Sequence, residues 1–587
     1  MRIRTKALRT RAMGALVCVV LGAAALAGCS SSSDSGSESG SGSGDQSSSS
    51  SAAAAVDGAQ KASAVLAADK EAHDGDWDES GAEEIALDGK SVTLTEAGTY
   101  RLSGKLSDGQ VLVDAPDQKV TLVLDGVDIA SSSGAAIAAT AVEELVVVLA
   151  DDSENTLSDA DSYAEDADAN AALFSAGDLT VGGTGSLTVR GRGNDGIASK
   201  DGLVIASGTV TVEAADDAVR GKDYLVVKGG SVTVTAKGDG LKADNTEDAD
   251  AGYIAVEGGT VKVTAAGDGV DAATDLVVTG GTLGVTAQAT DDSSAHGLKS
   301  GVITVLEKGT VTVDASADGL HSDAAVHLGG AKVTVAAGDD GVHAEGDLVI
   351  SGGTVGITRS NEGLEGKDIT VAGGTTQVTS GDDGVNASGS DGTSEGGGGG
   401  PGGGGGGMDV GDYTLKVTGG TLVIDADGDG FDSNGTAEIT GGTLVVNGPE
   451  TGGNGALDVN GSFTVSGGVL LAAGSAGMAV APDEESEQGW VSATLDASVA
   501  AGTTLHVVDA DDKVVATYVT SKTIQNVVFS SSAVKSGSEY RIWSGGEASG
   551  DSTGGMYAKG DLDGADEIAT VTAGDAPEGG FGGGPRR

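Results

Sequence analysis

Apolar and polar residues recur along this chain with a period of about twenty-two residues. From Asn194 to Val480, a repeat reads as a carboxylate, a glycine, an aliphatic residue, a polar residue and a small residue. The second position, taken as the centre of the repeat, is occupied in turn by Gly196, Ala218, Gly240, Gly269, Gly297, Gly319, Gly341, Gly363, Gly384, Gly430, Gly455 and Gly477. Self-similarity at this period predicts a solenoid, in which each repeat is one coil stacked on the next.

Each repeat contains three short apolar fragments whose alternation is typical of strands. Glycine pairs join the second and third fragments and predict a tight bend with positive φ on every coil. The pairs begin at Gly229, Gly258, Gly280, Gly329, Gly352, Gly373, Gly419, Gly441 and Gly467. Three strands in about twenty-two residues predict an all-β fold, a right-handed parallel β-helix, because a left-handed one favours strict hexapeptides.

The position after the centre is predicted to face inward and form an aliphatic stack. It holds Ile197, Val219, Leu241, Val270, Leu298, Leu320, Val342, Leu364, Val385, Phe431, Ala456 and Met478. Two places further on, most residues are small, which suits an inward position at a crowded corner. The position between them then points outward.

The same pattern divides the chain into segments, since repeats fade at both ends of the periodic region. Residues 81–160 are expected to form an N-terminal cap and the first coils, 161–480 the parallel β-helix with a Gly-rich insertion at 389–408, and 481–546 a small C-terminal β cap. Residues 29–80 are expected to be a Ser/Gly-rich tether, in which Ala59–Ala72 forms a short helix at most, and 547–587 a flexible Gly-rich tail.

The N-terminal residues are expected to be a targeting segment. Five basic residues precede the apolar run Ala15–Ala27, and Leu26-Ala27-Gly28-Cys29 resembles a bacterial lipobox. Residues 1–28 are therefore interpreted as a lipoprotein signal peptide, with lipidation at Cys29. This predicts an extracytoplasmic protein anchored in a membrane by lipid, with no disulfide because only one other cysteine, Cys18, exists and cleavage would remove it.

The strongly negative net charge of the chain limits which kinds of molecule it can bind. The formal net charge is −55, and such an acidic chain argues against nucleic acid, whose phosphates need Lys and Arg. It suits a cation-binding exterior. A monomer is expected.

The position before the centre is acidic in nine coils, which would place like charges about 4.8 Å apart along the stack. A buried row of charges is costly, so these carboxylates are expected at a solvated corner, with calcium bridging adjacent coils. The alternative is that these residues only hydrogen-bond the turn backbone. The candidate calcium ligands are Asp195, Asp217, Asp239, Asp244, Asp268, Asp271, Asp340 and Asp383.

The outward position forms a second ladder of mixed charge. Its advance per coil is close to one sugar of an extended polysaccharide, so it is a candidate carbohydrate track, although mixed charge ladders also stabilise parallel strands by themselves. The candidate carbohydrate-binding residues are Arg220, Lys242, Lys299, His321, His343 and Glu365. His321 and His343, on adjacent coils, are either a solvated pair or ligands of a transition metal.

Three motifs, Asn194–Asp201, Ala218–Asp223 and Gly238–Asn245, resemble successive coils of a family of bacterial carbohydrate-binding domains. The similarity extends from about Ile85 to Trp543. It implies a right-handed β-helix related in fold to family 9 polysaccharide lyases, calcium binding, and affinity for cellulose and acidic, pectin-like sugars without established catalysis. With only three Trp, the chain has few platforms for neutral sugars, which favours calcium-bridged uronates.

Two other functions remain open at this point. A calcium-dependent polysaccharide lyase would need a basic side chain with a lowered pKa beside acidic ligands, and Lys242 and Lys299 flank Asp271. A structural surface protein or adhesin would have no defined glycan.

Overall fold

The computed structural model describes residues 58–290, 294–389 and 410–577. The predicted signal peptide, Cys29, the first part of the tether, nearly all of the Gly-rich insertion and residues 578–587 lie outside these ranges. Within them the protein is all-β apart from one short helix, α1 (Ala62–Val65), and no helix is long and apolar enough to cross a membrane.

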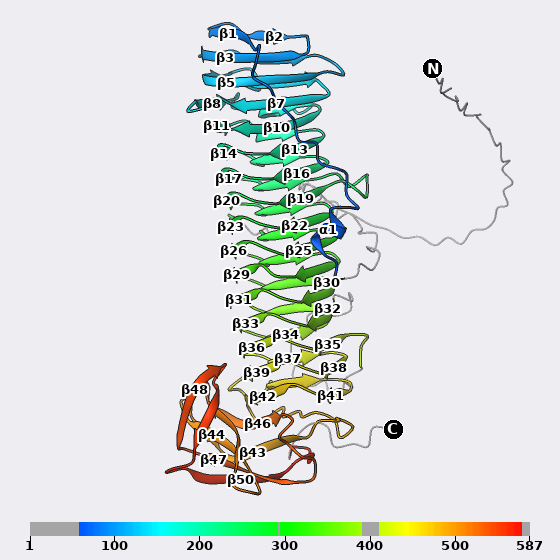
Figure 1. The fold of residues 1–587 in the computed structure, drawn as a ribbon, viewed down its shortest axis with the longest axis vertical. Helices are drawn as coiled ribbons and strands as arrows, with labels where there is room; N and C mark the ends of the chain where they lie inside the picture. Colours follow the sequence, from blue (N-terminus) through cyan, green and yellow to red (C-terminus); the bar gives the residue numbers. More distant parts are fainter. Residues whose placement is uncertain (1–57, 291–293, 390–409, 578–587) are drawn as a thin grey trace, which may run out of the picture. The chain divides into compact units, whose positions relative to one another are not determined.

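The coils stack to form three parallel sheets, so the predicted parallel β-helix is present (Figure 1). The strands of the first sheet follow the repeat centres, most of them beginning one residue after the centre. Its strands are β2 (Val92–Leu94), β4 (Val111–Asp114), β6 (Ile137–Ala141), β9 (Ala171–Ser175), β12 (Asp195–Ser199), β15 (Val219–Gly221), β18 (Leu241–Ala243), β21 (Val270–Ala272), β24 (Leu298–Ser300), β27 (Leu320–Ser322), the first parts of β30 (Val342–Ile350) and β32 (Leu364–Val371), β34 (Val385–Ala387), β37 (Phe431–Ser433) and β40 (Leu457–Val459).

The second and third sheets complete each coil. The second comprises β1 (Glu83–Asp88), the first parts of β3 (Gly98–Leu106) and β5 (Lys119–Ala130), β7 (Glu144–Leu149), β10 (Asp178–Gly183), β13 (Gly202–Ile205), β16 (Tyr224–Val227), β19 (Tyr253–Val256), β22 (Asp275–Val278), β25 (Ile303–Leu306), β28 (Ala325–Leu328), the ends of β30 and β32, β35 (Thr414–Val417), β38 (Thr436–Ile439) and β41 (Phe463–Val465). The third comprises the ends of β3 and β5, β8 (Glu154–Ser158), β11 (Ser186–Gly191), β14 (Thr209–Ala214), β17 (Ser231–Ala236), β20 (Thr260–Ala265), β23 (Thr282–Ala287), β26 (Thr310–Ala315), β29 (Lys332–Ala336), β31 (Thr354–Arg359), β33 (Thr375–Ser380), β36 (Thr421–Ala426), β39 (Thr443–Asn447) and β42 (Val469–Gly474).

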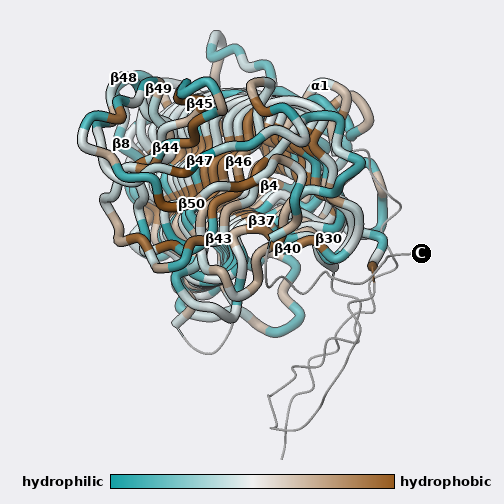
Figure 2. Tube along the Cα trace, turned by 90° about the horizontal axis from the view of Figure 1, so that it is seen from below, coloured by the Kyte–Doolittle hydropathy of each residue, from teal (hydrophilic) through white to brown (hydrophobic). Residues whose placement is uncertain are grey.

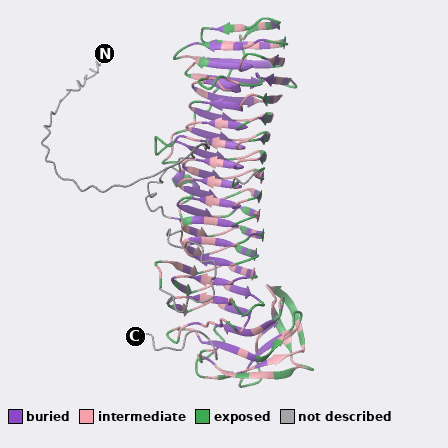
Figure 3. Ribbon diagram, turned by 180° about the vertical axis from the view of Figure 1, so that it is seen from behind, coloured by how far each residue is buried: buried purple, intermediate pink, exposed green. Residues whose placement is uncertain are grey.

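The inward residues of the three sheets form one continuous apolar core. Figure 2, which looks along the stack, shows hydrophobic segments gathered toward the middle, and Figure 3 shows buried strands joined by exposed turns. The predicted aliphatic stack is present from Ile197 to Phe431. In the next coil, however, Phe431 pairs with Leu457, so the centre is Ala456 and the assignment of Gly455 was wrong by one residue. Gly477 does not centre a coil, because β42 is the last strand of the third sheet and residues 475–489, all of them described, contain no strand.

A segment of residues 58–82, here called the strap, runs along the outer face of the second sheet from α1 to β1 (Figure 1). Ala62 and Val65 pack against Val277 and Val305, which point outward from β22 and β25. The strap is also held by Lys70, whose Nζ lies 2.7 Å from Asp201 Oδ1. The tether prediction is therefore wrong from residue 58 onward, and only four residues of the expected helix are helical. Val204, Val226, Val277 and Val305 are apolar outward residues of this sheet, and covering them with the strap stabilises both the sheet and the strap.

The C-terminal end of the stack is closed by antiparallel strands. β46 (Ile524–Ser530) pairs with both β42 and β43 (Trp490–Val499), which covers the exposed edge of the last coil. A separate six-stranded sheet packs beside it, in the order β48 (Glu547–Thr553), β49 (Met556–Asp561), β45 (Val514–Val519), β44 (Thr504–Asp509), β47 (Glu539–Ser544) and β50 (Asp566–Thr572). The β cap therefore continues beyond residue 546, and the prediction of a flexible tail is wrong through residue 572. Gly554 and Gly555, both with positive φ, form a hairpin turn between β48 and β49.

Glycine pairs make the bends between the second and third sheets. In eight of the nine pairs the second glycine has positive φ, the exception being Gly330. At Gly281, φ is +74° and a Cβ would lie 2.7 Å from the carbonyl carbon of Gly258 on the preceding coil. Both the backbone conformation and the close stacking therefore require glycine there.

We expect Gly281→Ala to lower the free energy of unfolding by about 1–3 kcal/mol, because alanine is strained at positive φ and contacts the neighbouring coil. Gly284→Ala, three residues further on in β23, is the matched control, since its Cβ would find its nearest neighbour at 4.0 Å. Urea denaturation midpoints of both variants measure the difference. Equal midpoints would contradict this account of the bend.

Candidate functional site

The outward positions of the first sheet lie in register along the stack and form a line of side chains, here called the outer ladder. The register runs Arg220, Lys242, Asp271, Lys299, His321, His343, Glu365, Asn386, Asp432 and Asp458. Basic residues dominate its beginning, from Arg220 to Lys299, and this part with its corner carboxylates is here called the basic half. Histidines occupy the middle. Carboxylates dominate the end, from Glu365 to Asp458, and this part with its corner carboxylates is here called the acidic half. Asp458 was missed because the last centre was misplaced by one residue.

The position before each centre forms a second line, here called the corner row. It comprises Asp195, Asp217, Asp239, Asp268, His296, Asp318, Asp340, Glu362, Asp383 and Asp429. The expectation of a solvated corner is wrong for several of these residues: Asp195 is 1% exposed and Asp318 5%. They do not enter the apolar core, but the outer ladder and the adjacent coils cover them.

One carboxylate oxygen of the corner row is used by the backbone. The amide of Asp239 donates to Asp217 Oδ1 at 2.8 Å, and the amide of Asp268 donates to Asp239 Oδ1 at 2.8 Å. The same bond recurs in the acidic half, where the amide of Asp429 donates to Asp383 Oδ1 at 2.7 Å. Hydrogen bonding to the turn backbone, the alternative to calcium, therefore accounts for one oxygen of these carboxylates. The backbone does not use the other oxygen.

In the basic half, the second oxygen faces a cation of the chain itself. Lys242 Nζ lies 2.6 Å from Asp239 Oδ2 and 3.3 Å from Asp217 Oδ2, and Lys299 Nζ lies 3.1 Å from Asp268 Oδ2. Arg220 Nη2 lies 2.5 Å from Asp244 Oδ2, and Arg220 Nη1 lies 3.7 Å from Asp195 Oδ2. The outer ladder and the corner row are therefore one electrostatic unit. Six of the eight predicted calcium ligands lie within 4.0 Å of these three basic residues.

These contacts bear on the lyase hypothesis. Burial tends to lower the pKa of Lys242, but Asp217 and Asp239 outweigh it and raise that pKa above its usual range. The pKa of Lys299 is raised in the same way by Asp268 and Asp271. A base that removes a proton from a sugar must be neutral, so both lysines have shifts opposite to the required one.

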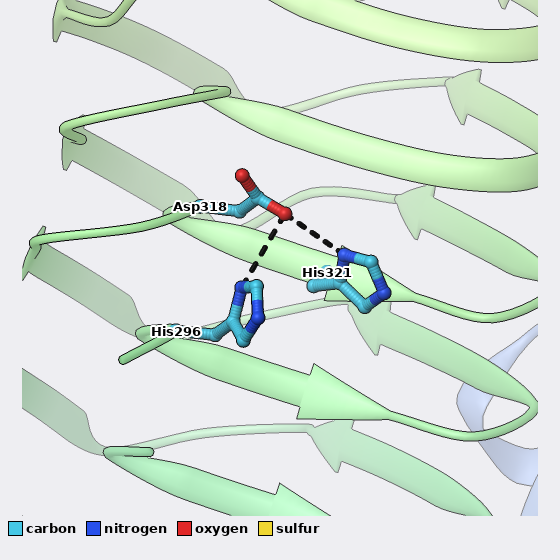
Figure 4. A group of neighbouring side chains, drawn as sticks. All are labelled: His296, Asp318 and His321. Carbon is cyan, nitrogen blue, oxygen red and sulfur yellow. Dashed lines mark hydrogen bonds and ion pairs between the residues drawn. The ribbon is translucent and has the colours of Figure 1, made fainter. Parts of the chain in front are cut away.

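In the middle of the two rows, three histidines on consecutive coils surround Asp318 (Figure 4 shows two of them). Asp318 Oδ2 lies 2.8 Å from His321 Nδ1, 3.3 Å from His296 Nδ1 and 3.8 Å from His343 Nδ1. Burial opposes ionisation of Asp318, but the nearby imidazoles of His296 and His321 lower its pKa below the usual range. Burial tends to lower the pKa of His321, and Asp318 and Asp323 outweigh it and raise that pKa to about 9.

His296 was missed in the sequence. It occupies the corner position of its coil, where the other coils through Asp429 have Asp or Glu. A histidine in place of a carboxylate at this repeat position could have identified it from the sequence.

In the acidic half the carboxylates face one another. Burial and neighbouring carboxylates raise the pKa of Glu362 and of Asp432 to about 8, and those of Asp383 and Asp429 to about 6. Asn386 Nδ2 donates a hydrogen bond to Glu362 Oε2 at 3.0 Å. The side-chain carbonyl oxygen of Asn386 is buried and has no hydrogen-bond partner. Of the predicted calcium ligands, Asp340 and Asp383 lie in or next to this region. It is a dense set of oxygen donors, and a bound cation would relieve its repulsion.

The fold and these two rows define a class of protein, a parallel β-helix with a charged, ladder-like surface along one sheet. A model of the family described as carbohydrate-binding domain-containing protein matches residues 88–341 and 335–562. The chain therefore belongs to that family, as its motifs suggested.

Two known proteins are similar to parts of the chain. A carbohydrate-binding domain-containing protein of Acetivibrio thermocellus is 37% identical over 135 residues, 22% of this chain and 47% of the relative. The chain thus matches about half of that relative's length. A solved structure, described as a polysaccharide lyase-like protein from C. thermocellum in a gadolinium derivative, is 28% identical, covers 46% of this chain and 95% of its own, and has a TM-score of 0.31.

The raised pKa values predict a pH dependence. Between the ordinary carboxyl pKa of about 4 and the folded values near 8, the folded state holds protons that the unfolded state has released, so stability falls as pH rises. In chelator, we expect the free energy of unfolding to fall between pH 6 and 8.5, and Asp432→Asn to reduce this fall by about 1 kcal/mol or more.

Urea unfolding at the two pH values measures the effect. Glu438→Gln, at an exposed position on β38, is the control and should leave the fall unchanged. An identical fall in the wild type and Asp432→Asn would contradict the role of this carboxylate.

Proposed function

We propose that this carbohydrate-binding protein recognises an extended, acidic polysaccharide through calcium held in the acidic half of the two rows. The observation that carries the proposal is the group of partly buried carboxylates Glu362, Asp383, Asp429 and Asp432, with the unsatisfied carbonyl oxygen of Asn386 among them. Oxygen donors in this number suit calcium, which takes six to eight of them.

The basic half is a less favourable place for calcium, which supports placing the ion in the acidic half. Arg220, Lys242 and Lys299 already compensate the carboxylates beside them, so calcium there would have to displace a side chain that is ion-paired and partly buried. We therefore place calcium nearer to Asp340 and Asp383 than to the six other predicted ligands.

The aromatic residues favour recognition by charge. Among the described residues, Trp490 is buried in the C-terminal cap, Trp543 stacks under Arg541, and Trp77 is on the strap, 37% exposed. None of these tryptophans lies on the outer ladder. Flat stacking surfaces for neutral sugars are therefore scarce on the first sheet, whereas fixed charges repeat at every coil.

We make two further proposals, one about the handedness of the coil and one about the cellular location of the protein. We propose a right-handed coil, since connections between parallel strands are right-handed in about 98% of cases. We also propose lipidation at Cys29 and an extracytoplasmic, membrane-anchored protein that acts as a monomer. The lipobox-like sequence supports the anchor.

Calcium added to chelated protein should raise the melting temperature and allow polygalacturonate to pull the protein down, because the ion removes repulsion in the folded state and bridges sugar carboxylates. The double variant Glu362→Gln with Asp432→Asn should lose both effects. Asp244→Asn, in the basic half, is the control and should keep them.

Calorimetric titration with calcium, thermal melts and glycan pull-downs measure these effects. If chelator changes neither stability nor pull-down, the calcium-bridged model fails. If Asp244→Asn loses calcium as the double variant does, calcium is not confined to the acidic half.

The anchor has a separate test. Cys29→Ser should move the protein from the membrane fraction to the soluble fraction of the cells that produce it, because the acylated thiol is lost. Fractionation followed by immunoblotting checks this, and a variant that stays in the membrane fraction would exclude this anchor.

A further inference from the structure

The histidines of the chain are concentrated at the middle of the two rows. Three of the six, His296, His321 and His343, lie on three consecutive coils. Their rings are close together, with centroids 4.8 Å apart for the first pair and 5.0 Å apart for the second. Imidazoles are poor calcium ligands but common ligands of zinc, copper and nickel, so this zone differs in chemistry from the acidic half.

The nearest donors have distances that suit a tetrahedral ion. The ligand atoms of His296, Asp318 and His321 all lie within 4.8 Å of one another (Figure 4). Asp318 Oδ2 is 2.8 Å from one imidazole nitrogen and 3.3 Å from the other. Two donors bound to zinc at about 2.0–2.1 Å lie about 3.3–3.4 Å apart across a tetrahedral edge. Small side-chain movements are therefore enough to place an ion between them.

The surroundings hold these donors in place. Asp318 Oδ1 accepts the amide of Asp340 at 3.1 Å, which fixes the carboxylate plane. His321 Nε2 lies 3.4 Å from Asp323 Oδ1, so the ring nitrogen that would not bind the ion has a carboxylate partner. Ligand histidines commonly have such a partner, which sets their orientation. His296 Nδ1 is buried and makes no well-aligned hydrogen bond, although Asp318 is 3.3 Å away.

We propose that His296, Asp318 and His321 bind one divalent transition ion, of the zinc, copper or nickel class, at the boundary between the basic and acidic halves. The ligands come from two adjacent coils, so the ion would link them. Three protein donors leave the fourth position of a tetrahedral ion open to His343, to water or to an oxygen of a bound sugar. Its ligands are distinct from the proposed calcium ligands, although Asp340, one of those, lies on the adjacent coil and donates its amide to Asp318 Oδ1.

The test uses the full chain, with excess calcium to saturate the oxygen sites, titrated with zinc in a calorimeter. We expect one zinc site in the wild type, and a loss of at least about tenfold in affinity in His296→Gln and in His321→Gln. His73→Gln, at an exposed histidine on the strap, is the control for nonspecific binding and should keep the affinity. Asp432→Asn should also keep it, which separates this site from the calcium proposal.

Cobalt gives a second measurement that needs no variant. Substituted into the wild type, cobalt(II) should show the visible absorption of a tetrahedral ion with nitrogen and oxygen ligands, and zinc should displace it. The proposal is overturned by zinc binding that His296→Gln and His321→Gln leave unchanged, by no binding in the wild type, or by an octahedral cobalt spectrum. In each of these cases the three residues form only histidine–aspartate ion pairs.

Discussion

In the first sheet of this protein, the side chains of each strand lie above their counterparts in the next coil, because the parallel strands pair in register from β12 to β40. Equivalent residues therefore repeat at the strand spacing of about 4.8 Å. For apolar residues this gives a continuous core. For carboxylates it means repulsion at every step, and the chain must offset that repulsion coil by coil.

The structure meets this requirement differently in three zones. In the first, lysine and arginine side chains of the outer ladder lie over the corner carboxylates. In the second, histidines take that position, and in the third the carboxylates face one another, so that burial and mutual repulsion raise their pKa values. One backbone pattern thus presents three chemistries along one sheet. Membership of a carbohydrate-binding family gives this graded surface its proposed use, since an extended glycan would contact all three zones.

The parts of the protein that do not repeat determine where the stack is covered. The strap buries outward apolar residues of the second sheet, and antiparallel strands close the C-terminal end. Because the strap and the cap cover other parts of the coils, the first sheet remains the place where charged side chains line up. Function is therefore proposed on that sheet.

The repeat itself was predictable, since the period of the apolar residues is enough to tell inward positions from outward ones. So were the glycine bends, the aliphatic stack and the acidic row, each of which depends on residues within one coil. The strap was not, because residues 58–82 contact β10 to β30 far away in the sequence and have no period of their own. The partner of each corner carboxylate was decided only by the tertiary structure. Lys242 reaches Asp217 and Asp239, and His296 joins Asp318 and His321, because stacking brings side chains from neighbouring coils within a few ångströms.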